Sequence, residues 1–387
     1  MVKIPSYTDK INFKESHDLS GSGVTEDSAK RISEVFDRQI KAGLHPGAQL
    51  VVLKNGRAIV DQYGGYTDTR KSVPVTPTTK FLTFSVTKPL TSACIFKLVD
   101  ESKVTLDSHV GEYWPEFACN GKEEITIRQV LLHQSGLPVR GFINQLLNIS
   151  NTEKISGYLA GQKPEFQPGT KTAYQYLNFG FILGEIIKRV SGKPVDDFLG
   201  EKYLWPMGIN NTSMNISEPE DDGYAKLCSG TFDHRLVASI FNSSSFRQAV
   251  IPAASLHSTA RDLAVFFQML LNEGKYGGTK YLERTTVQLA TSLGNEGFDE
   301  SIKRVTRWGY GFSLGGEHKI NPDLPDGMGY GSSLDTFGHF GQRTSMAWAD
   351  KRTGLVVVFL CNRFLSSTDY KIRLREISDA VWDVAGD

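Results

Sequence analysis

The order of strand and helix patterns along the chain is the feature that most limits its possible folds. Two β-rich runs surround Asn55-Gly56, a dipeptide that favours a tight hairpin because both residues accept a positive φ. Strong β patterns return only towards the other end, in RWGYGFSLGG, GHFGQRTSMAWAD and GLVVVFLCN. Strands supplied by both ends of a chain around a helical middle predict one antiparallel sheet with helices packed on it.

The segment between these β-rich ends has mainly helical patterns, as in ITIRQVLLHQSGL and LNFGFILGEIIKRVSG. A chain of 387 residues exceeds the usual size of a single core, so either two domains or one catalytic unit with a large insertion is expected. We predict a polar leader over 1–25, a discontinuous α/β domain over 26–103 and 250–387, and a mainly helical insertion over 104–249. The predicted fold class is α+β, an α/β sandwich whose antiparallel sheet is flanked by helices.

Charge and apolar content exclude several classes of partner. Lys plus Arg equals Asp plus Glu at 43 each, so no net charge recruits nucleic acid or a membrane surface. The N-terminal stretch has no continuous apolar core of a signal peptide, and no later run reaches membrane-spanning length. We expect a cytoplasmic protein that acts on a small molecule. No sequence motif for a metal or a nucleotide occurs, so no cofactor is expected.

Residues 81–101, FLTFSVTKPLTSACIFKLVDE, form an apolar run that contains Ser85 and, one helical turn later, Lys88. Pro89 indicates the first turn of a helix, where a missing backbone N–H costs nothing. Ser85 then lies at a helix N-terminus, where free N–H groups and the helix dipole favour an anion. Burial among apolar residues favours a neutral lysine, which can accept the serine proton.

The alternative is that the serine only caps a helix, because Ser-x-x-Lys is a short pattern that arises by chance. Two observations favour the chemical interpretation. The pattern occurs once in this sequence, and its apolar surroundings are unusual for a surface lysine.

Two later triplets turn this pair into a set of three motifs. These are Tyr-Leu-Asn at 176–178 and His-Phe-Gly at 339–341. In this order the motifs resemble those of the serine β-lactamase and penicillin-binding-protein superfamily. The likeness extends over most of residues 26–387 and is to the class C branch. That branch includes class C β-lactamases, D-alanyl-D-alanine carboxypeptidases, D-aminopeptidases and family VIII carboxylesterases, and in it the helical insertion forms the other wall of the active site.

The resemblance implies a role for each residue of the first two motifs. Ser85 is the expected acylated nucleophile, and Lys88 and Tyr176 are expected to share the proton transfers as a coupled pair. Asn178 is expected to hydrogen-bond the substrate or Lys88. A tyrosine alone is more often a core aromatic, and Tyr174 precedes this motif by two residues, but only Tyr176 has an asparagine at the second position after it.

The third motif is expected on the strand that borders the pocket. His339 and Gly341 would line it, and the backbone N–H of Gln342 would be the second oxyanion donor. A histidine beside a turn glycine is more often structural, and His133 in HQSGL is interpreted that way. β-Lactamases usually carry Lys-Thr-Gly at the third motif, so the replacement by histidine and Phe340 predicts weaker recognition of an anionic substrate.

These observations predict a serine hydrolase that cleaves small carboxylic esters through an acyl-enzyme on Ser85. One alternative changes the substrate and gives a D-aminopeptidase, a D-alanyl-D-alanine carboxypeptidase or a weak β-lactamase. An acyltransferase with the same nucleophile is a variant of it. The other alternative is a non-catalytic binding protein, which the intact motifs disfavour. The oligomeric state is not predicted.

Overall fold

The computed structural model of the protein describes residues 10–13, 19–139, 149, 151–216, 223–229, 232–316, 319–320 and 327–385. Residues 1–9 and 14–18 of the expected leader lie outside these ranges. Eight strands form one antiparallel sheet in the order β2-β1-β13-β12-β11-β10-β9-β8. Their bounds are β1 Gly47–Lys54, β2 Arg57–Gly65, β8 Asn295–Asp299, β9 Arg304–Trp308, β10 Ser313–Leu314, β11 Thr336–Gly341, β12 Ser345–Asp350 and β13 Leu355–Cys361.

The N-terminal hairpin forms one edge of this sheet and joins the C-terminal strands through the pairing of β1 with β13. The turn residues Asn55 and Gly56 have φ of 53° and 76°, which is the conformation that their sequence favours. β1 then pairs with β13 over seven residues, from Ala48–Cys361 to Lys54–Leu355. The predicted sheet from both ends of the chain is therefore confirmed, and so is the α+β class.

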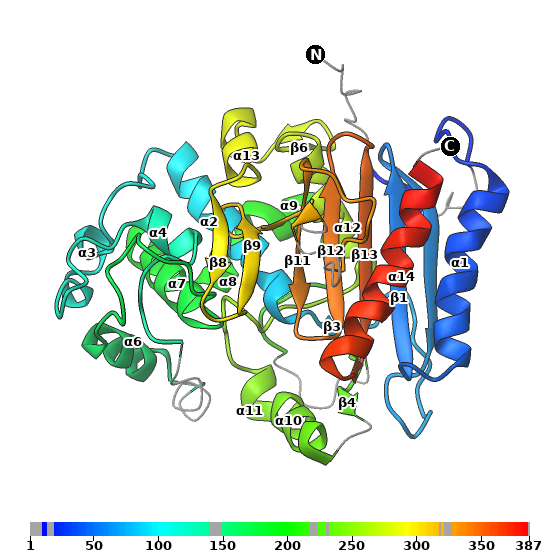
Figure 1. The fold of residues 1–387 in the computed structure, drawn as a ribbon, viewed down its shortest axis with the longest axis horizontal. Coiled ribbons are helices and arrows are strands. Elements are labelled where there is room, and N and C mark those ends of the chain that lie inside the picture. The colour runs from blue at the N-terminus through cyan, green and yellow to red at the C-terminus, as the bar shows by residue number, and fades with distance from the viewer. Residues whose placement is uncertain are drawn as a thin grey trace.

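Alternation along the strands gives the sheet two apolar faces. Leu50 and Val52 of β1 join the cluster beneath α1 (Glu26–Lys41) and α14 (Ser367–Ala385). Val51 joins the larger cluster on the opposite face, with α2 (Thr87–Asp100) and α12 (Ala260–Leu271). Because successive side chains of a strand point to opposite faces, both faces need cover. Figure 1 shows α1 and α14 together on one side of the sheet, with the other helices beyond it.

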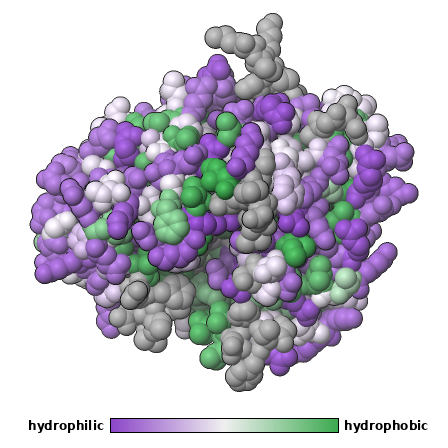
Figure 2. Space-filling view, in the orientation of Figure 1, coloured by the Kyte–Doolittle hydropathy of each residue, from purple (hydrophilic) through white to green (hydrophobic). Residues whose placement is uncertain are grey.

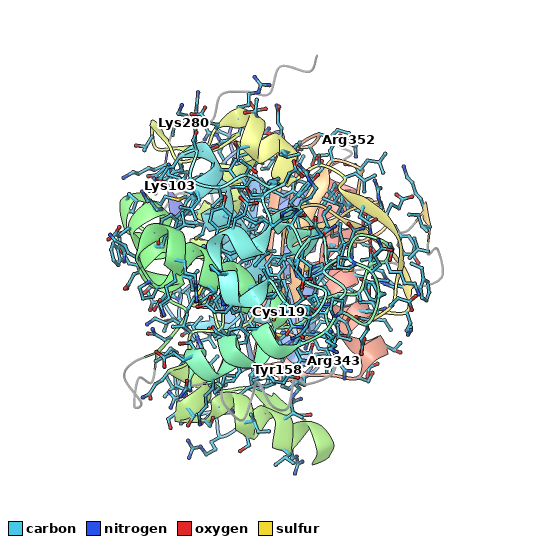
Figure 3. All side chains as sticks on the ribbon, turned by 90° about the vertical axis from the view of Figure 1, so that its left-hand side faces the viewer. Lys103, Cys119, Tyr158, Lys280, Arg343 and Arg352 are labelled. Carbon is cyan, nitrogen blue, oxygen red and sulfur yellow. The ribbon has the colours of Figure 1, made fainter. Side chains whose placement is uncertain are left out.

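The chain between β2 and β8 is mainly helical. Figure 3 views this part from outside, with Cys119 and Tyr158 on the side that faces the viewer. Short paired strands accompany the helices: β3 Phe81–Leu82 with β5 His257–Ser258, β6 Lys275–Tyr276 with β7 Thr279–Lys280, and β4 Cys228–Ser229 with β14 Arg363–Phe364. The remaining helical segments are η2 Phe84–Val86, α3 Val110–Tyr113, η3 Pro115–Phe117, α4 Ile127–Leu131, α6 Thr152–Gly161, α7 Asn178–Ser191, α8 Val195–Leu199, η4 Gly200–Leu204, α9 Trp205–Met207, α10 Phe232–Asn242, α11 Ser244–Arg247 and α13 Arg284–Ala290.

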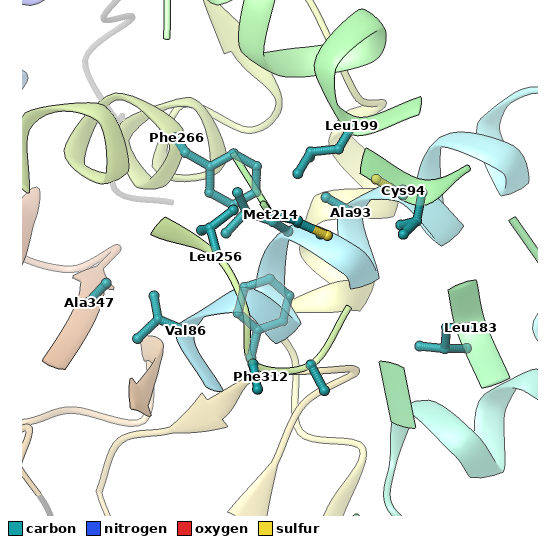
Figure 4. Packing of buried hydrophobic residues seen from close by; sticks show 14 of the residues in the cluster. Val86, Ala93, Cys94, Leu183, Leu199, Met214, Leu256, Phe266, Phe312 and Ala347 are labelled. Carbon is teal, nitrogen blue, oxygen red and sulfur yellow. The ribbon is translucent and has the colours of Figure 1, made fainter. Parts of the chain in front are cut away.

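Among the described residues of 104–249, none belongs to a strand of the eight-stranded sheet, and the division into an α/β domain and an insertion stays a prediction. α2 lies at the centre of the larger cluster. Its residues from Thr87 to Phe96 are all buried, and Figure 4 shows Ala93 and Cys94 among side chains from several other elements. A helix that is apolar all round needs such a position.

The outer surface on the face shown in Figure 2 is mostly hydrophilic, with apolar side chains in small groups. Across the part of the chain that the structure describes, no helix is both long and apolar enough to cross a bilayer.

Candidate active site

The central helix begins with a strained turn that carries Ser85. The chain leaves β3, passes through the 3-10 turn η2 and enters α2 at Thr87. Phe84, which directly precedes Ser85, has φ of 48°. A bulky aromatic residue rarely adopts this left-handed conformation, and such outliers concentrate at functional sites. In the segment from Phe81 to Leu90, every residue is buried except Ser85, which stays partly exposed.

Lys88 is buried beneath Ser85 at the start of α2. Its Nζ lies 3.2 Å from the Ser85 Oγ, 2.9 Å from the backbone carbonyl oxygen of Tyr176 and 3.3 Å from that of Ala253. The side chain is 0% exposed, and burial holds the pKa of Lys88 well below its ordinary value. A neutral amine has two hydrogens, which suit the two carbonyl oxygens, and one lone pair, which suits the hydrogen of the Ser85 hydroxyl.

A second tyrosine, Tyr174, lies beside Lys88 and Ser85. Its side chain is 6% exposed, the Lys88 Nζ lies 4.7 Å from its ring centroid, and Ser85 is a neighbour that partly offsets the effect of burial on its pKa. Trp308 stacks on the other side of this ring, with centroids 5.2 Å apart. Burial raises the pKa of Tyr174, so the phenol keeps its proton.

Tyr176, the tyrosine that the Tyr-x-Asn spacing predicts, contacts Lys88 through its backbone only. Its side chain is 41% exposed and meets the Tyr174 ring edge-on at 5.1 Å. The structure thus brings two tyrosines to Lys88, Tyr176 through its backbone carbonyl oxygen and Tyr174 through its ring. The role expected for the Tyr176 side chain stays a prediction. Tyr174 was set aside in the sequence because only Tyr176 has an asparagine at the second position after it.

Asn178 begins α7 and fastens this loop. Its Nδ2 donates both hydrogens, to the Pro138 carbonyl oxygen at 3.0 Å and to the Gln175 Oε1 at 2.8 Å. Both amide hydrogens thus have partners in the protein, and the expected hydrogen bond of Asn178 to the substrate or Lys88 stays a prediction. Gln175 in turn donates to the carbonyl oxygens of Leu137 and Ala173. The residues around Tyr174 are held by a continuous set of hydrogen bonds.

β11 places the third motif beside the nucleophile turn. His339 is buried, with its ring centroid 6.0 Å from that of Tyr174. Gly341 lies so close to the turn that a Cβ added there would be 2.0 Å from the Thr83 carbonyl oxygen. Only glycine fits this approach without displacement. Gln342 follows at the end of the strand and is exposed.

The neighbours of His339 keep it neutral. Burial, and secondarily the nearby Lys88, lower the pKa of His339 to about 3. The Nδ1 lies 2.9 Å from both the N–H and the carbonyl oxygen of Phe340, so its backbone partners are those of the next residue along the strand. Phe340 itself packs with the cluster beneath α14, so its ring points away from the site. Compared with Lys-Thr-Gly, this position therefore lacks the threonine hydroxyl but does not place a bulky ring against the substrate.

Comparisons with known proteins show the family and the fold. The model of the Beta-lactamase family matches residues 34–381. The esterase/β-lactamase LipL of Mycobacterium tuberculosis is 27% identical over 352 residues, which are 83% of this chain and 78% of LipL.

Two solved structures are similar over nearly all of this chain. A penicillin-binding-protein homologue from Caulobacter crescentus superposes with a TM-score of 0.81 and 26% identity, covering 93% of this chain and 98% of its own. A family VIII carboxylesterase gives 0.80 and 28%, covering 92% and 98%.

Sheet, central helix and bordering strand together define a hydrolase of the β-lactamase and penicillin-binding-protein superfamily. Within it, the chain belongs to the β-lactamase family.

Proposed function

We propose that this protein is a serine hydrolase that cleaves small, uncharged carboxylic esters through an acyl-enzyme on Ser85. The observation that carries the proposal is the arrangement of two groups around one hydroxyl. Lys88, whose pKa burial lowers, contacts the Ser85 Oγ at 3.2 Å, and Tyr174, whose pKa burial raises, lies beside the pair with its ring centroid 4.7 Å from the Lys88 Nζ. Groups whose environments separate their pKa values in this way are the natural base and acid of a site.

In acylation, Lys88 takes the hydroxyl proton of Ser85 while the Oγ bonds to the carbonyl carbon of the ester. The carbonyl electron pair moves onto oxygen and gives a tetrahedral oxyanion. As this collapses, the bond from carbon to the alcohol oxygen breaks, and Tyr174 gives its proton to that oxygen. The alcohol leaves, with a phenolate on Tyr174 and an ammonium on Lys88 that balance each other in charge.

Deacylation reverses these roles with water in place of the alcohol. The Tyr174 phenolate takes a proton from the water as its oxygen bonds to the acyl carbon. When the second tetrahedral species collapses, the Ser85 Oγ leaves and takes the proton held by Lys88. The carboxylic acid departs and all three side chains return to their starting states.

The oxyanion needs donors that are in place before the reaction. The N–H of Ser85, at the start of a helix, and the N–H of Gln342, beyond the close approach of Gly341 to Thr83, are the proposed pair. Loss of one such donor typically costs about 10²–10³ in kcat.

Charge favours an ester over an anionic substrate. Burial keeps both Lys88 and His339 uncharged, so neither supplies a fixed cation for the carboxylate of a β-lactam or a peptide C-terminus. The name of the similar family VIII carboxylesterase supports an ester substrate, and the name of LipL includes both esterase and β-lactamase.

The test compares p-nitrophenyl butyrate with a chromogenic cephalosporin as substrates for wild type and Ser85→Ala. Ser33→Ala on α1 is the matched control, because Ser33 lies on the opposite face of the sheet. We expect ester turnover that exceeds cephalosporin turnover, is lost in Ser85→Ala and is kept in Ser33→Ala. Ester turnover that persists in Ser85→Ala would exclude this nucleophile, and faster cephalosporin turnover would exclude the ester preference.

A further inference from the structure

Three successive backbone N–H groups around Tyr174 are fastened to two residues that are remote in sequence. The Ala173 N–H donates to the His133 carbonyl oxygen at 2.9 Å, and the Gln175 N–H donates to the His133 Nδ1 at 3.3 Å. Between them, the Tyr174 N–H donates to the Asp299 Oδ1 at 3.1 Å. One histidine thus holds the peptide units on both sides of Tyr174.

His133 is itself held rigidly. It is 0% exposed, and its ring packs against those of Tyr174, Trp308 and Phe179 at centroid distances of 4.7, 4.8 and 5.2 Å. Its φ is 59°, which turns the chain back after α4 so that the carbonyl oxygen and the ring reach the same loop. Such a conformation persists only where the surroundings enforce it.

The chemical state of this ring is fixed by its contacts. Because Nδ1 accepts a hydrogen bond, the ring hydrogen lies on Nε2, for which the described residues offer no partner. Burial lowers the pKa of His133 well below its ordinary value, with Lys88 and His339 adding to the effect. A neutral acceptor is therefore present throughout the working pH range.

We infer that His133 is a positioning residue that sets the Tyr174 hydroxyl against the Ser85 hydroxyl. The inference rests on the proposed function, in which Tyr174 protonates the leaving alcohol. A proton transfer requires heavy atoms within about 2.6–3.2 Å, so a small shift of this loop removes the acid from reach. His133 touches neither Lys88 nor Ser85 among its recorded hydrogen bonds, and acts through the tyrosine.

Two variants separate the acceptor from the ring. His133→Asn keeps an acceptor atom close to the position of Nδ1 and tolerates the positive φ, but removes the ring. His133→Phe keeps an aromatic ring and removes the acceptor. His45→Phe is the control for burying phenylalanine in place of histidine, because His45 is also buried but packs on Phe359 in the cluster beneath α14.

The ratio of kcat/KM for two esters distinguishes a misplaced acid from a general structural defect. p-Nitrophenolate is a stable anion that leaves without protonation, whereas an alkoxide needs the proton of Tyr174. Loss of a positioned acid therefore lowers kcat/KM for ethyl butyrate more than for p-nitrophenyl butyrate. Disorder of the whole site lowers both by the same factor.

The experiment measures kcat/KM for both esters in wild type, the three variants, Tyr174→Phe, and Tyr174→Phe combined with His133→Phe. We expect His133→Phe to lower the ethyl butyrate value about 10- to 100-fold, the loss typical of a misplaced catalytic group, and the p-nitrophenyl value much less. His133→Asn restores most of the loss, and His45→Phe stays near wild type. In the Tyr174→Phe background, His133→Phe adds less than about twofold, because residues that act as a unit are not additive.

Equal losses for the two esters, or the same loss with and without the Tyr174 hydroxyl, overturn the positioning role. So does a His133→Asn variant as impaired as His133→Phe with an unchanged thermal midpoint. A Tyr174→Phe enzyme with wild-type rates on ethyl butyrate instead removes the proposed acid itself. If His133→Phe keeps the wild-type kcat/KM for ethyl butyrate while Tyr174→Phe is impaired, the positioning role of His133 is excluded and the proposed acid stands.

Discussion

The Lys88 Nζ lies 2.9 Å from the backbone carbonyl oxygen of Tyr176, a contact that any residue at position 176 can make. The tyrosine two positions earlier makes a contact that depends on its side chain, because its ring centroid lies 4.7 Å from the Lys88 Nζ and Ser85 influences the pKa of its hydroxyl. The two tyrosines therefore divide the work in the site. One supplies a peptide carbonyl that orients the amine of Lys88, and the other supplies a titratable hydroxyl.

The first prediction follows from this division and compares Tyr174→Phe with Tyr176→Phe. Both changes remove one hydroxyl and keep one ring, so each is a control for the other. Tyr174→Phe is expected to lower kcat/KM for ethyl butyrate by about 10²–10⁴, the usual contribution of a general acid. Tyr176→Phe is expected to stay within a few-fold of wild type, because the carbonyl of residue 176 is unchanged.

Steady-state kinetics on the purified variants, with circular dichroism to check folding, measures both effects. The reverse order, with Tyr176→Phe impaired and Tyr174→Phe active, would restore the tyrosine that the motif spacing favours.

The second prediction concerns the pH dependence of kcat/KM for ester hydrolysis. Lys88 acts as a base only when neutral, so activity rises as pH increases through its pKa, which burial has lowered. Activity is expected to hold through pH 9, because burial raises the pKa of Tyr174 and keeps the acid protonated. His339, with a pKa of about 3, stays neutral throughout this range.

A pH series from 5 to 9.5 on wild type and His339→Asn measures this, after incubation controls for stability. The acid limb is expected at the same pH in both proteins, whatever the change in absolute rate. An acid limb near 6.5, the ordinary histidine value, that disappears in His339→Asn would show that His339 titrates instead.

The third prediction is a change in the pH dependence of stability in Lys88→Met. The folded protein holds Lys88 neutral, whereas the unfolded chain protonates it below its ordinary value of 10.5. The unfolded state then binds one more proton, so this group makes the free energy of unfolding rise with pH by about 1.4 kcal/mol per unit. Lys88→Met lacks this term, and its stability relative to wild type is expected to decline by that slope between pH 7 and 9.

Urea unfolding at pH 7, 8 and 9 gives the free energies of unfolding of wild type and of Lys88→Met. The two carbonyl oxygens that lose the amine cost the variant about 1–3 kcal/mol each, but this cost does not change with pH. The slope of the difference therefore tests the protonation state alone. Parallel curves would mean that the folded protein holds a charged Lys88.

Local patterns predicted much of the fold and part of the site. Asn55-Gly56 predicted its hairpin because the turn is determined by the two residues that form it. Ser85 and Lys88 meet because three residues along a helix start bring side chains to one face. Tyr174 could not be assigned in the same way, since which of two alternating loop tyrosines faces Ser85 depends on remote partners.

Those partners explain what the sequence left open. His133 and Asp299 fix the direction of Tyr174 through backbone hydrogen bonds, and neither bond has a signature in the order of residue types. His133 was interpreted as structural, and the sequence did not indicate that its partners lie in a loop about forty residues further on. The direction of the Phe340 ring was likewise not predicted from the motif, because strand alternation directs it to the cluster beneath α14.

The last prediction tests the close approach between β11 and the nucleophile turn. In Gly341→Ala, the new Cβ would lie 2.0 Å from the Thr83 carbonyl oxygen and 2.1 Å from the Ser345 Oγ, which itself donates to that oxygen. These backbone and short side-chain atoms cannot give way without moving the strand end from the turn that carries Ser85. Gly297→Ala in β8 is the control, since its added Cβ meets nothing within 4 Å.

We expect Gly341→Ala to lower kcat/KM for p-nitrophenyl butyrate by about 100-fold, because a displacement of about 1 Å in a site has that effect. Overpacking also costs about 1–3 kcal/mol of stability, seen as a lower thermal midpoint. Gly297→Ala is expected to change neither quantity appreciably. If Gly341→Ala kept full activity with a lowered midpoint, the strand end would support the fold without positioning the oxyanion donor at Gln342, and that donor would have to be sought elsewhere around Ser85.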